Sequence, residues 1–333
     1  MASTAFPKLA RKAILSDGTT YGYIHVPATG SKPTFLLLHG APSSSYIWHH
    51  QVELLPKAGF GILVPDLLGY GDTDKPESYE PYQMKCLVPQ VHELVTKVLD
   101  TPKVIGVGHD FGAGLLSHLY VHHKELFSQL VFIATGFMFL DSPFDPDSVI
   151  QMSKEILGYS TSGYVKVFIS PDGATLVEKN DRRVDSLFYA QDPKVWIEYF
   201  GEPGGFTKFL ESDIEIPVAH WISPAELEMH NRILRAGGYT GPFNWYKAAV
   251  FCGPAKEDQD LPAEEKTINI PTLYIATLKD YAVITDMHIQ NLRGLAKDLR
   301  VEKLDVGHWA MLEGKERVEA LLEEVGNAQI RKL

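Results

Sequence analysis

Cysteine is scarce in this sequence, and long apolar runs are missing. The 333 residues include only two cysteines, Cys86 and Cys252, which are too few for the disulfide framework of a small secreted protein. No stretch approaches the roughly 18 consecutive apolar residues that a membrane span needs. The segment Met1 to Arg11 also lacks the apolar core of a signal peptide. We therefore expect a cytoplasmic protein with no membrane span.

The C-terminal tripeptide matches a peroxisomal targeting signal only in part. The chain ends in Arg331-Lys332-Leu333, which shares its last two residues with the Ser-Lys-Leu signal but has arginine in place of the small first residue. A peroxisomal location is therefore kept as an alternative to the cytoplasm.

Clusters of positive charge are lacking as well. The formal net charge is −11, and no stretch gathers the lysines and arginines that neutralise phosphates in nucleic-acid binding proteins. A nucleic-acid partner is therefore not expected. The 45% of apolar and 22% of charged residues are ordinary for a globular protein. A chain of this length buries roughly three quarters of its unfolded surface, so we expect one large domain with an insertion, or two domains.

Strand-like and helix-like segments alternate through the first part of the chain. This alternation predicts an α/β fold with a doubly wound, mostly parallel sheet. Two alternating segments joined at Asp17-Gly18 predict a hairpin at its start. The predicted strands cover 8–16, 19–27, 34–38, 61–66, 104–107 and 130–134, and the predicted helices cover 47–57, 83–99 and 113–120.

After Thr135 the pattern changes to an aromatic-rich, helical segment without a long β-favouring run. One helix in it is well marked, with Ser223 as N-cap, Pro224 at the first position and Glu226 completing a capping box. Sheet character returns at 271–277, followed by a helix from about Asp286, a strand over 301–306 and a closing helix over 313–330. We predict a sheet core over 1–136 and 268–333, with an inserted helical cap over 137–267.

Three loops that follow predicted strands each carry one reactive side chain. These are Asp110, Asp280 and His308, in the order nucleophile, acid and histidine that α/β-hydrolases use. Ligands of open α/β sheets bind at the carboxyl ends of the strands, where three such residues converge. Asp110 stands on a tight turn between a strand and a helix, and backbone N–H groups with the helix dipole are expected there to favour its charged form.

The residues around Asp110 disfavour two other interpretations of this turn. Gly106 and Gly108 suggest a dinucleotide-binding loop, but the third glycine is Gly112 rather than position 111. The acidic residue expected about 20 residues further on is also missing. A serine esterase would need serine in place of Asp110.

Taken together, these motifs resemble those of soluble epoxide hydrolases, in the aspartate-nucleophile branch of the α/β-hydrolase superfamily. The likeness covers nearly the whole chain. It runs through His39-Gly40-Ala41-Pro42, Gly108-His109-Asp110-Phe111-Gly112, Gly163-Tyr164, Gly241-Pro242-Phe243-Asn244-Trp245-Tyr246, Lys279-Asp280 and Gly307-His308-Trp309.

The resemblance implies a role for each matching residue and a small-molecule epoxide and water as substrates. It implies no cofactor and no metal. Asp110 corresponds to the nucleophile, His308 to the base, Asp280 to its orienting acid, Tyr164 and Tyr246 to the cap phenols, Phe111 and Ala41 to the oxyanion N–H donors, and Trp245, Trp309 and Pro42 to the substrate-binding wall.

The chemistry explains why these residue types are needed. A carboxylate that attacks an epoxide carbon forms an ester, which water can hydrolyse, whereas a serine would leave a stable ether. Phenols with an ordinary pKa of about 10 can hold and protonate the epoxide oxygen. A histidine oriented by an acid can activate the water, and backbone N–H groups can hold the resulting oxyanion.

A haloalkane dehalogenase is the main alternative, because such enzymes also use an aspartate nucleophile and the loop 43–48 resembles theirs. The family pattern holds the halide with side-chain N–H groups, however, and Phe111 and Ala41 have none. A binding protein that has lost catalysis is a third hypothesis, which the complete set of Asp110, Asp280 and His308 disfavours.

Several other side chains are assigned to structure rather than chemistry. His118 and His122 have the spacing of zinc ligands on a helix but lack the rest of a metalloprotease signature, so packing is expected. The aromatic cap surface is compatible with a homodimer. The remaining structural assignments are Tyr159, Tyr189 and Tyr199 to wall or core, and His39 and His109 to loop geometry.

Overall fold

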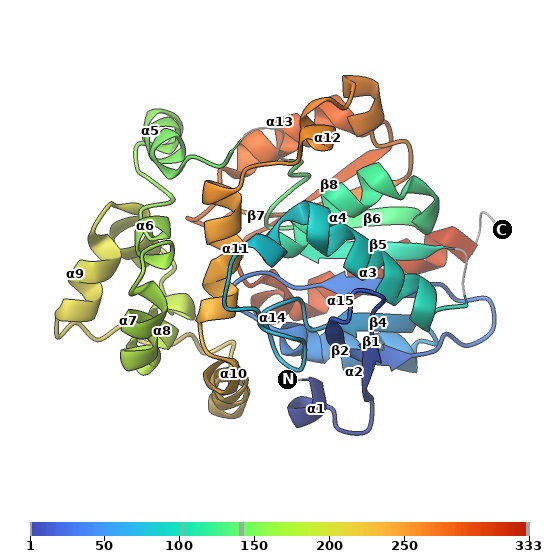
Figure 1. Cartoon of the computed structure of the whole chain (residues 1–333), viewed down its shortest axis with the longest axis horizontal. Coiled ribbons are helices and arrows are strands. Elements are labelled where there is room, and N and C mark those ends of the chain that lie inside the picture. Colours follow the sequence, from blue (N-terminus) through green and yellow to red (C-terminus); the bar gives the residue numbers. More distant parts are fainter. Residues whose placement is uncertain (1, 101–102, 140–142, 331–333) are drawn as a thin grey trace.

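A single sheet forms the centre of the molecule (Figure 1). The computed structural model describes residues 2–100, 103–139 and 143–330. Its eight strands follow the order β1-β2-β4-β3-β5-β6-β7-β8, and within the described residues β2 alone runs in the opposite direction to the other strands. The predicted α/β fold with a mostly parallel sheet is therefore confirmed. The strands are β1 (Ala10–Ile14), β2 (Thr20–Val26), β3 (Thr34–Leu38), β4 (Gly61–Pro65), β5 (Val104–His109), β6 (Phe127–Ile133), β7 (Thr272–Thr277) and β8 (Leu299–Leu304).

The central strands are the continuous apolar runs of the sequence. Every residue of β3, β4, β5 and β7 is buried, as expected for strands that are covered on both faces. The predicted hairpin is present, with Ile14 opposite Thr20. Gly18 has a φ of 87°, a conformation that glycine adopts without steric cost.

The core helices pack beside the strands in two pairs, α3 against α4 and α2 against α15. The predicted helix over 47–57 begins as a 3₁₀ turn, and the closing helix is interrupted at Gly314. The core elements are α1 (Ala2–Ala5), η1 (Ser45–Trp48), α2 (His49–Lys57), η2 (Glu80–Tyr82), α3 (Met84–Val98), α4 (Phe111–His122), η3 (Lys124–Leu126), α13 (Thr285–Leu295), α14 (Ala310–Glu313) and α15 (Lys315–Ile330).

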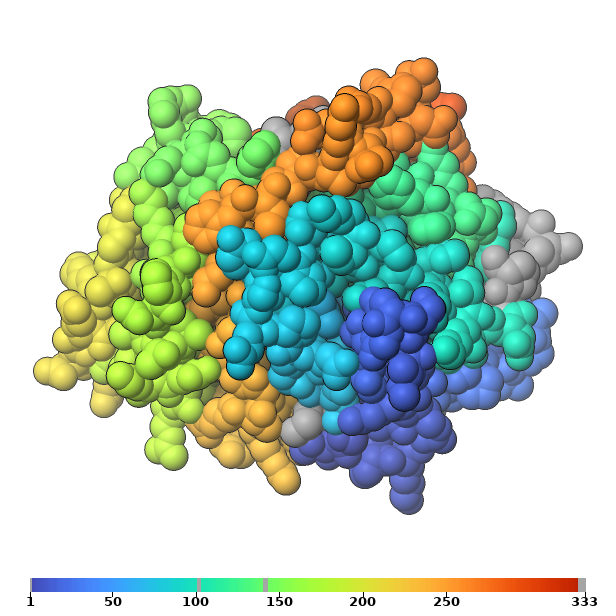
Figure 2. Space-filling view, in the orientation of Figure 1, coloured from blue at the N-terminus to red at the C-terminus, as the bar shows by residue number. Residues whose placement is uncertain are grey.

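The inserted segment between β6 and β7 is helical and lies to one side of the sheet (Figure 1). In the space-filling view its green and yellow residues form the left of the molecule, with the orange segment across the junction (Figure 2). The cap boundaries at 137 and 267 stay a prediction. The helices are α5 (Pro146–Leu157), α6 (Val165–Phe168), α7 (Gly173–Lys179), α8 (Asp181–Phe188), η4 (Ile197–Gly201), α9 (Gly205–Glu211), α10 (Pro224–Gly237), α11 (Thr240–Phe251), α12 (Lys256–Gln259) and η5 (Ala263–Lys266).

The cap has its own aromatic core. Phe168 stacks on Phe243 with ring centroids 4.0 Å apart, and its edge meets Phe206. The predicted capping box of α10 is present: Ser223 Oγ accepts the Glu226 N–H, while the Glu226 carboxylate accepts the Ser223 N–H. The aromatic residues of the cap thus provide the packing that holds its short helices together.

Within the described ranges, no helix combines the length and apolar character needed to cross a membrane. Arg331-Lys332-Leu333 lies outside the described residues. The cytoplasmic location and the homodimer stay predictions.

Candidate active site

Asp110 occupies a sharp turn between β5 and α4. Its φ of 54° and ψ of −123° are unusual for a residue with a side chain and belong to a strained strand-to-helix elbow. Gly40 and Gly112 make room for this turn. A Cβ atom at Gly40 would overlap the Asp110 side chain, and one at Gly112 would overlap the Leu38 carbonyl group. The elbow therefore presents the carboxylate beyond the end of the sheet.

The turns after β7 and β8 bring Asp280 and His308 to the same edge. His308 Nδ1 lies 2.6 Å from Asp280 Oδ2, and His308 Nε2 lies 3.9 Å from Asp110 Oδ2. The structure thus places together three side chains that are far apart in the sequence. The distance between His308 and Asp110 is too long for a direct hydrogen bond.

Neighbouring residues in the chain hold the Asp280 carboxylate in place. Its Oδ1 accepts the Ala282 N–H at 2.9 Å, and the Thr277 hydroxyl lies 3.4 Å from its Oδ2. The Asp280 side chain is fully buried. Because Nδ1 of His308 faces this carboxylate, Nδ1 carries the proton and Nε2 has its lone pair free in the neutral ring.

Two further residues lie against His308: Trp196, which has no signal in the sequence, and His109, which the sequence assigns to loop geometry. Trp196, from the cap, packs against the His308 ring at 5.6 Å between centroids. His109 Nε2 lies 3.0 Å from the His308 carbonyl oxygen, to which it donates. Burial lowers the pKa of His109 well below its usual value, so this ring is neutral and acts on loop geometry, as expected from the sequence.

Local hydrogen bonds and burial act in opposite directions on the pKa of Asp110. Ala41 N–H donates to Asp110 Oδ1 at 2.8 Å. Burial nevertheless raises the pKa of Asp110 above its ordinary value, although His308 and the N–H groups of Ala41 and Phe111 act to lower it. The local groups therefore favour the charged form as predicted, but desolvation outweighs them.

For His308, unlike Asp110, the neighbouring charges outweigh the effect of burial on the pKa. Burial acts to lower its pKa, but the charge and hydrogen bond of Asp280, together with the charge of Asp110, raise the pKa above its ordinary value. The negative charge of Asp110 thus contributes to keeping a proton on His308. When Asp110 becomes a neutral group, part of this contribution disappears.

Replacing Asp110 by asparagine is therefore expected to lower the pKa of His308, because the neutral amide removes a nearby negative charge. With a lower pKa, His308 loses its proton at a lower pH in the variant than in the wild type. NMR titration of the imidazole signals measures this shift. His25 on β2 serves as an internal control, and an unchanged or raised His308 pKa would contradict the expectation.

Tyr164 and Tyr246 lie together in the cap. Their rings are 5.8 Å apart and nearly perpendicular, and Tyr246 meets the ring of Phe111 edge-on at 4.8 Å. Tyr164 directly precedes α6, and Tyr246 lies within α11. Burial and the negative charge of Asp110 raise the pKa of both phenols. Both therefore remain protonated at neutral pH and can donate hydrogen bonds.

The two tryptophans assigned to the substrate-binding wall link segments through their indole N–H groups. Trp245 donates to the Leu68 carbonyl at 2.9 Å, and Trp309 donates to the Phe188 carbonyl at 2.8 Å. Their rings also border two pockets, one that includes Phe111 and another that includes His308. Pro42 is buried in the loop that follows Ala41.

The histidines assigned to structure have defined partners. His39 donates through Nδ1 to the Gly40 carbonyl and accepts the Leu67 N–H at Nε2. His118 is buried and stacks on Phe139 at 4.4 Å. Its neighbour on the helix, His122, lies within hydrogen-bond distance of Asp258, with Nε2 2.7 Å from Oδ1. Asp258 is a cap residue that the sequence did not connect with these histidines.

The tyrosines assigned to wall or core also have ring partners. Tyr189 is buried and packs on Trp309 at 5.4 Å. Tyr199 packs on Phe209. Tyr159 lies beside Tyr281.

Comparisons with known proteins find relatives that are named epoxide hydrolases. Epoxide hydrolase A of Mycobacterium tuberculosis is 26% identical over 307 residues, which cover 88% of this chain and 89% of that protein. Bifunctional epoxide hydrolase 2 of Rattus norvegicus is 26% identical over 334 residues, which cover 96% of this chain and 58% of the relative. The chain thus spans a little over half the length of this mammalian relative. The resemblance predicted from the motifs is confirmed.

A solved structure has the same fold. The epoxide hydrolase from an endophytic Streptomyces superposes with a TM-score of 0.78 at 23% identity, covering 98% of this chain and 97% of that one. The family described as the alpha/beta hydrolase fold matches residues 33–315. This chain therefore belongs to the α/β-hydrolase fold family.

Proposed function

We propose that this protein is an epoxide hydrolase that opens an epoxide to a vicinal diol through a covalent ester on Asp110. The observation that carries the proposal is the pairing of two protonated cap phenols, Tyr164 and Tyr246, over the elbow that presents Asp110. The names of the relatives support the same substrate class.

In the first step, Asp110 attacks an epoxide carbon. Ala41 N–H holds Oδ1, which leaves Oδ2 as the freer oxygen for the attack. A bond forms between Oδ2 and the carbon while the carbon–oxygen bond of the epoxide breaks. Tyr164 and Tyr246 hydrogen-bond the departing oxygen, and one of them donates its proton. The products of this step are an alkyl ester and a phenolate, which regains its proton at the end of the second step.

In the second step, His308 activates a water molecule. Nε2 takes a proton from the water as its oxygen attacks the carboxyl carbon of Asp110. Backbone N–H groups of Ala41 and Phe111 stabilise the oxyanion on Oδ1. The bond from the carboxyl carbon to the diol oxygen then breaks, and the diol oxygen accepts the proton from His308. Asp110 is left as a carboxylic acid, and its proton passes through water to the phenolate formed in the first step, which restores both the Asp110 carboxylate and the phenol. Asp280 keeps the ring in the required tautomer and stabilises the imidazolium.

The dehalogenase alternative lacks suitable halide donors at this site. Phe111 and Ala41 have no side-chain N–H group, and the indole N–H groups of Trp245 and Trp309 already donate to backbone carbonyls. The alternative of a non-catalytic binding protein is disfavoured by the close approach of His308 to both Asp280 and Asp110.

A single turnover in heavy-oxygen water tests the proposal. Enzyme in excess is mixed with a styrene-oxide-like substrate, and the diol and the protein are analysed by mass spectrometry. We expect an unlabelled diol in the first turnover and label in Asp110, because water attacks the ester carbonyl. A diol labelled in the first turnover would exclude the covalent step.

A matched chloroalkane substrate separates the alternatives. We expect diol formation from the epoxide and no halide release from the chloroalkane. Halide release from the chloroalkane without epoxide turnover would favour the dehalogenase, and the absence of both activities would favour a binding protein.

A further inference from the structure

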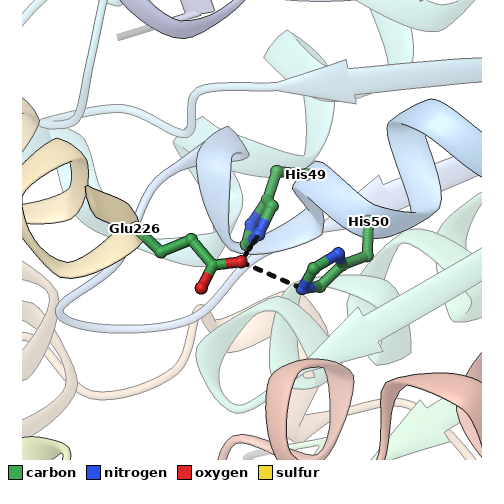
Figure 3. Close-up of side chains that lie close together, drawn as sticks. All are labelled: His49, His50 and Glu226. Carbon is green, nitrogen blue, oxygen red and sulfur yellow. Dashed lines mark hydrogen bonds and ion pairs between the residues drawn. The ribbon is translucent and has the colours of Figure 1, made fainter. Parts of the chain in front are cut away.

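A second cluster of chemically active side chains lies away from the candidate active site, where the core meets the cap. His49 and His50 begin α2, and Glu226 lies in the first turn of α10. Glu226 Oε1 is 2.9 Å from His49 Nε2 and 3.4 Å from His50 Nε2. Figure 3 shows the carboxylate directed toward both imidazole rings. The cluster thus joins two segments that are far apart in the sequence.

Both ring nitrogens of His49 face oxygen atoms that can only accept hydrogen bonds. Its Nδ1 lies 3.0 Å from the Tyr46 carbonyl oxygen, which can only accept, so Nδ1 carries a proton. In a neutral ring, the Nε2 lone pair then points at a carboxylate oxygen, which is repulsive. A second proton or a bound cation removes this repulsion. A histidine that donates its other N–H to a backbone carbonyl is the usual arrangement of a metal ligand.

Glu226 is oriented in advance by the capping box. Its Oε2 accepts the Ser223 N–H at 2.7 Å, which leaves Oε1 to face the histidines. An ordinary glutamate carboxylate is charged at neutral pH, as a metal ligand must be.

His50 supplies a second unused nitrogen. Its Nε2 is buried and has no hydrogen-bond partner among the residues that the structure describes, despite its distance of 3.4 Å from Glu226. Buried polar atoms without a partner are uncommon in native proteins and call for an explanation, such as an ion that binds there.

The separations suit a tetrahedral ion. The three ligand atoms lie within 4.8 Å of one another, and two pairs are 2.9 and 3.4 Å apart. Bonds of 2.0–2.1 Å to a tetrahedral zinc ion place neighbouring ligands about 3.3 Å apart. The side chains are only 9%, 18% and 21% exposed, which shelters the site but leaves access for a water as fourth ligand.

We propose that His49, His50 and Glu226 form a binding site for a divalent transition metal, with zinc as the expected ion, that fastens the cap to the core. Two imidazoles and one carboxylate are ligands that zinc accepts readily. The ion would bridge α2 and α10 at a distance from Asp110 and serve a structural rather than a chemical role.

Cobalt(II) titration of untagged, chelator-treated protein tests this site, because tetrahedral cobalt absorbs visible light. We expect the wild-type chain to bind one equivalent with micromolar or tighter affinity and to release it when zinc is added. Glu226→Gln should weaken binding at least about tenfold, since it removes a ligand charge while glutamine still completes the capping box. His50→Gln should have a similar effect.

Two matched variants control for other sites. His123→Gln disrupts a second group of His92, His123 and Glu125, in which Glu125 is 73% exposed. His308→Gln removes the histidine of the candidate active site, to which cobalt could otherwise bind. Both variants should retain the cobalt band. Zinc should also raise the Tm of the wild-type chain but not that of Glu226→Gln.

The proposal is overturned if the wild-type chain binds no cobalt up to about 100 μM, well above the affinities of structural zinc sites. It is equally overturned if Glu226→Gln and His50→Gln bind as tightly as the wild type. In either case the cluster binds no metal and is only a contact between α2 and α10.

Discussion

Replacing His308 by glutamine is expected to leave ester formation intact and to stop its hydrolysis. Asp110 performs the first step without a base, whereas the attack of water on the ester needs Nε2 of His308. We expect kcat to fall by about 10³-fold or more, as when a general base is removed. Intact-protein mass spectrometry after mixing with a styrene-oxide-like substrate should show one added substrate mass that persists.

Asp110→Ala is the matched control for this experiment, because it removes the nucleophile and should give no adduct. Thermal unfolding of both variants checks that they are folded. Rapid diol release by His308→Gln would remove His308 from its proposed role, and an adduct on Asp110→Ala would place the nucleophile elsewhere.

Replacing both Tyr164 and Tyr246 by phenylalanine is expected to suppress epoxide opening itself. The double variant keeps the ring packing but leaves the developing charge on the epoxide oxygen without a donor. We expect kcat/KM to fall by about 10³-fold or more, from the combined loss of acid catalysis and charge stabilisation. Rapid-quench mass spectrometry should show slow formation of the ester, in contrast to the His308→Gln variant.

Tyr199→Phe serves as the control for the cap, since Tyr199 is also a buried cap tyrosine but packs on Phe209 rather than over the elbow. It should retain activity close to that of the wild type. Retained epoxide turnover in the double variant would contradict the role of the phenols and would direct attention to a different electrophile.

The local elements of the core could be predicted from the sequence because short-range physics sets them. Continuous apolar runs indicate strands that are buried on both faces, and β3, β4 and β7 coincide with such runs. The capping box at Ser223 and the tight turn at Asp110 were predictable for the same reason. Their signals lie within a few neighbouring residues.

Other features of the site depend on burial and on contacts between distant segments. The direction of the Asp110 pKa depends on desolvation by the whole molecule, which outweighs the local N–H groups. The hydrogen bonds of the Trp245 and Trp309 indole N–H groups depend on carbonyl groups in distant segments. Neither quantity is encoded in a local motif.

The sequence by itself thus determined the α/β fold, the elbow at Asp110 and the order of Asp110, Asp280 and His308, because local patterns carry this information. Only the tertiary structure decided how near His308 lies to both carboxylates and that Tyr164 meets Tyr246. It alone also brought Glu226 to His49 and His50. These contacts form when the cap packs on the sheet, and the two parts come from distant stretches of the chain.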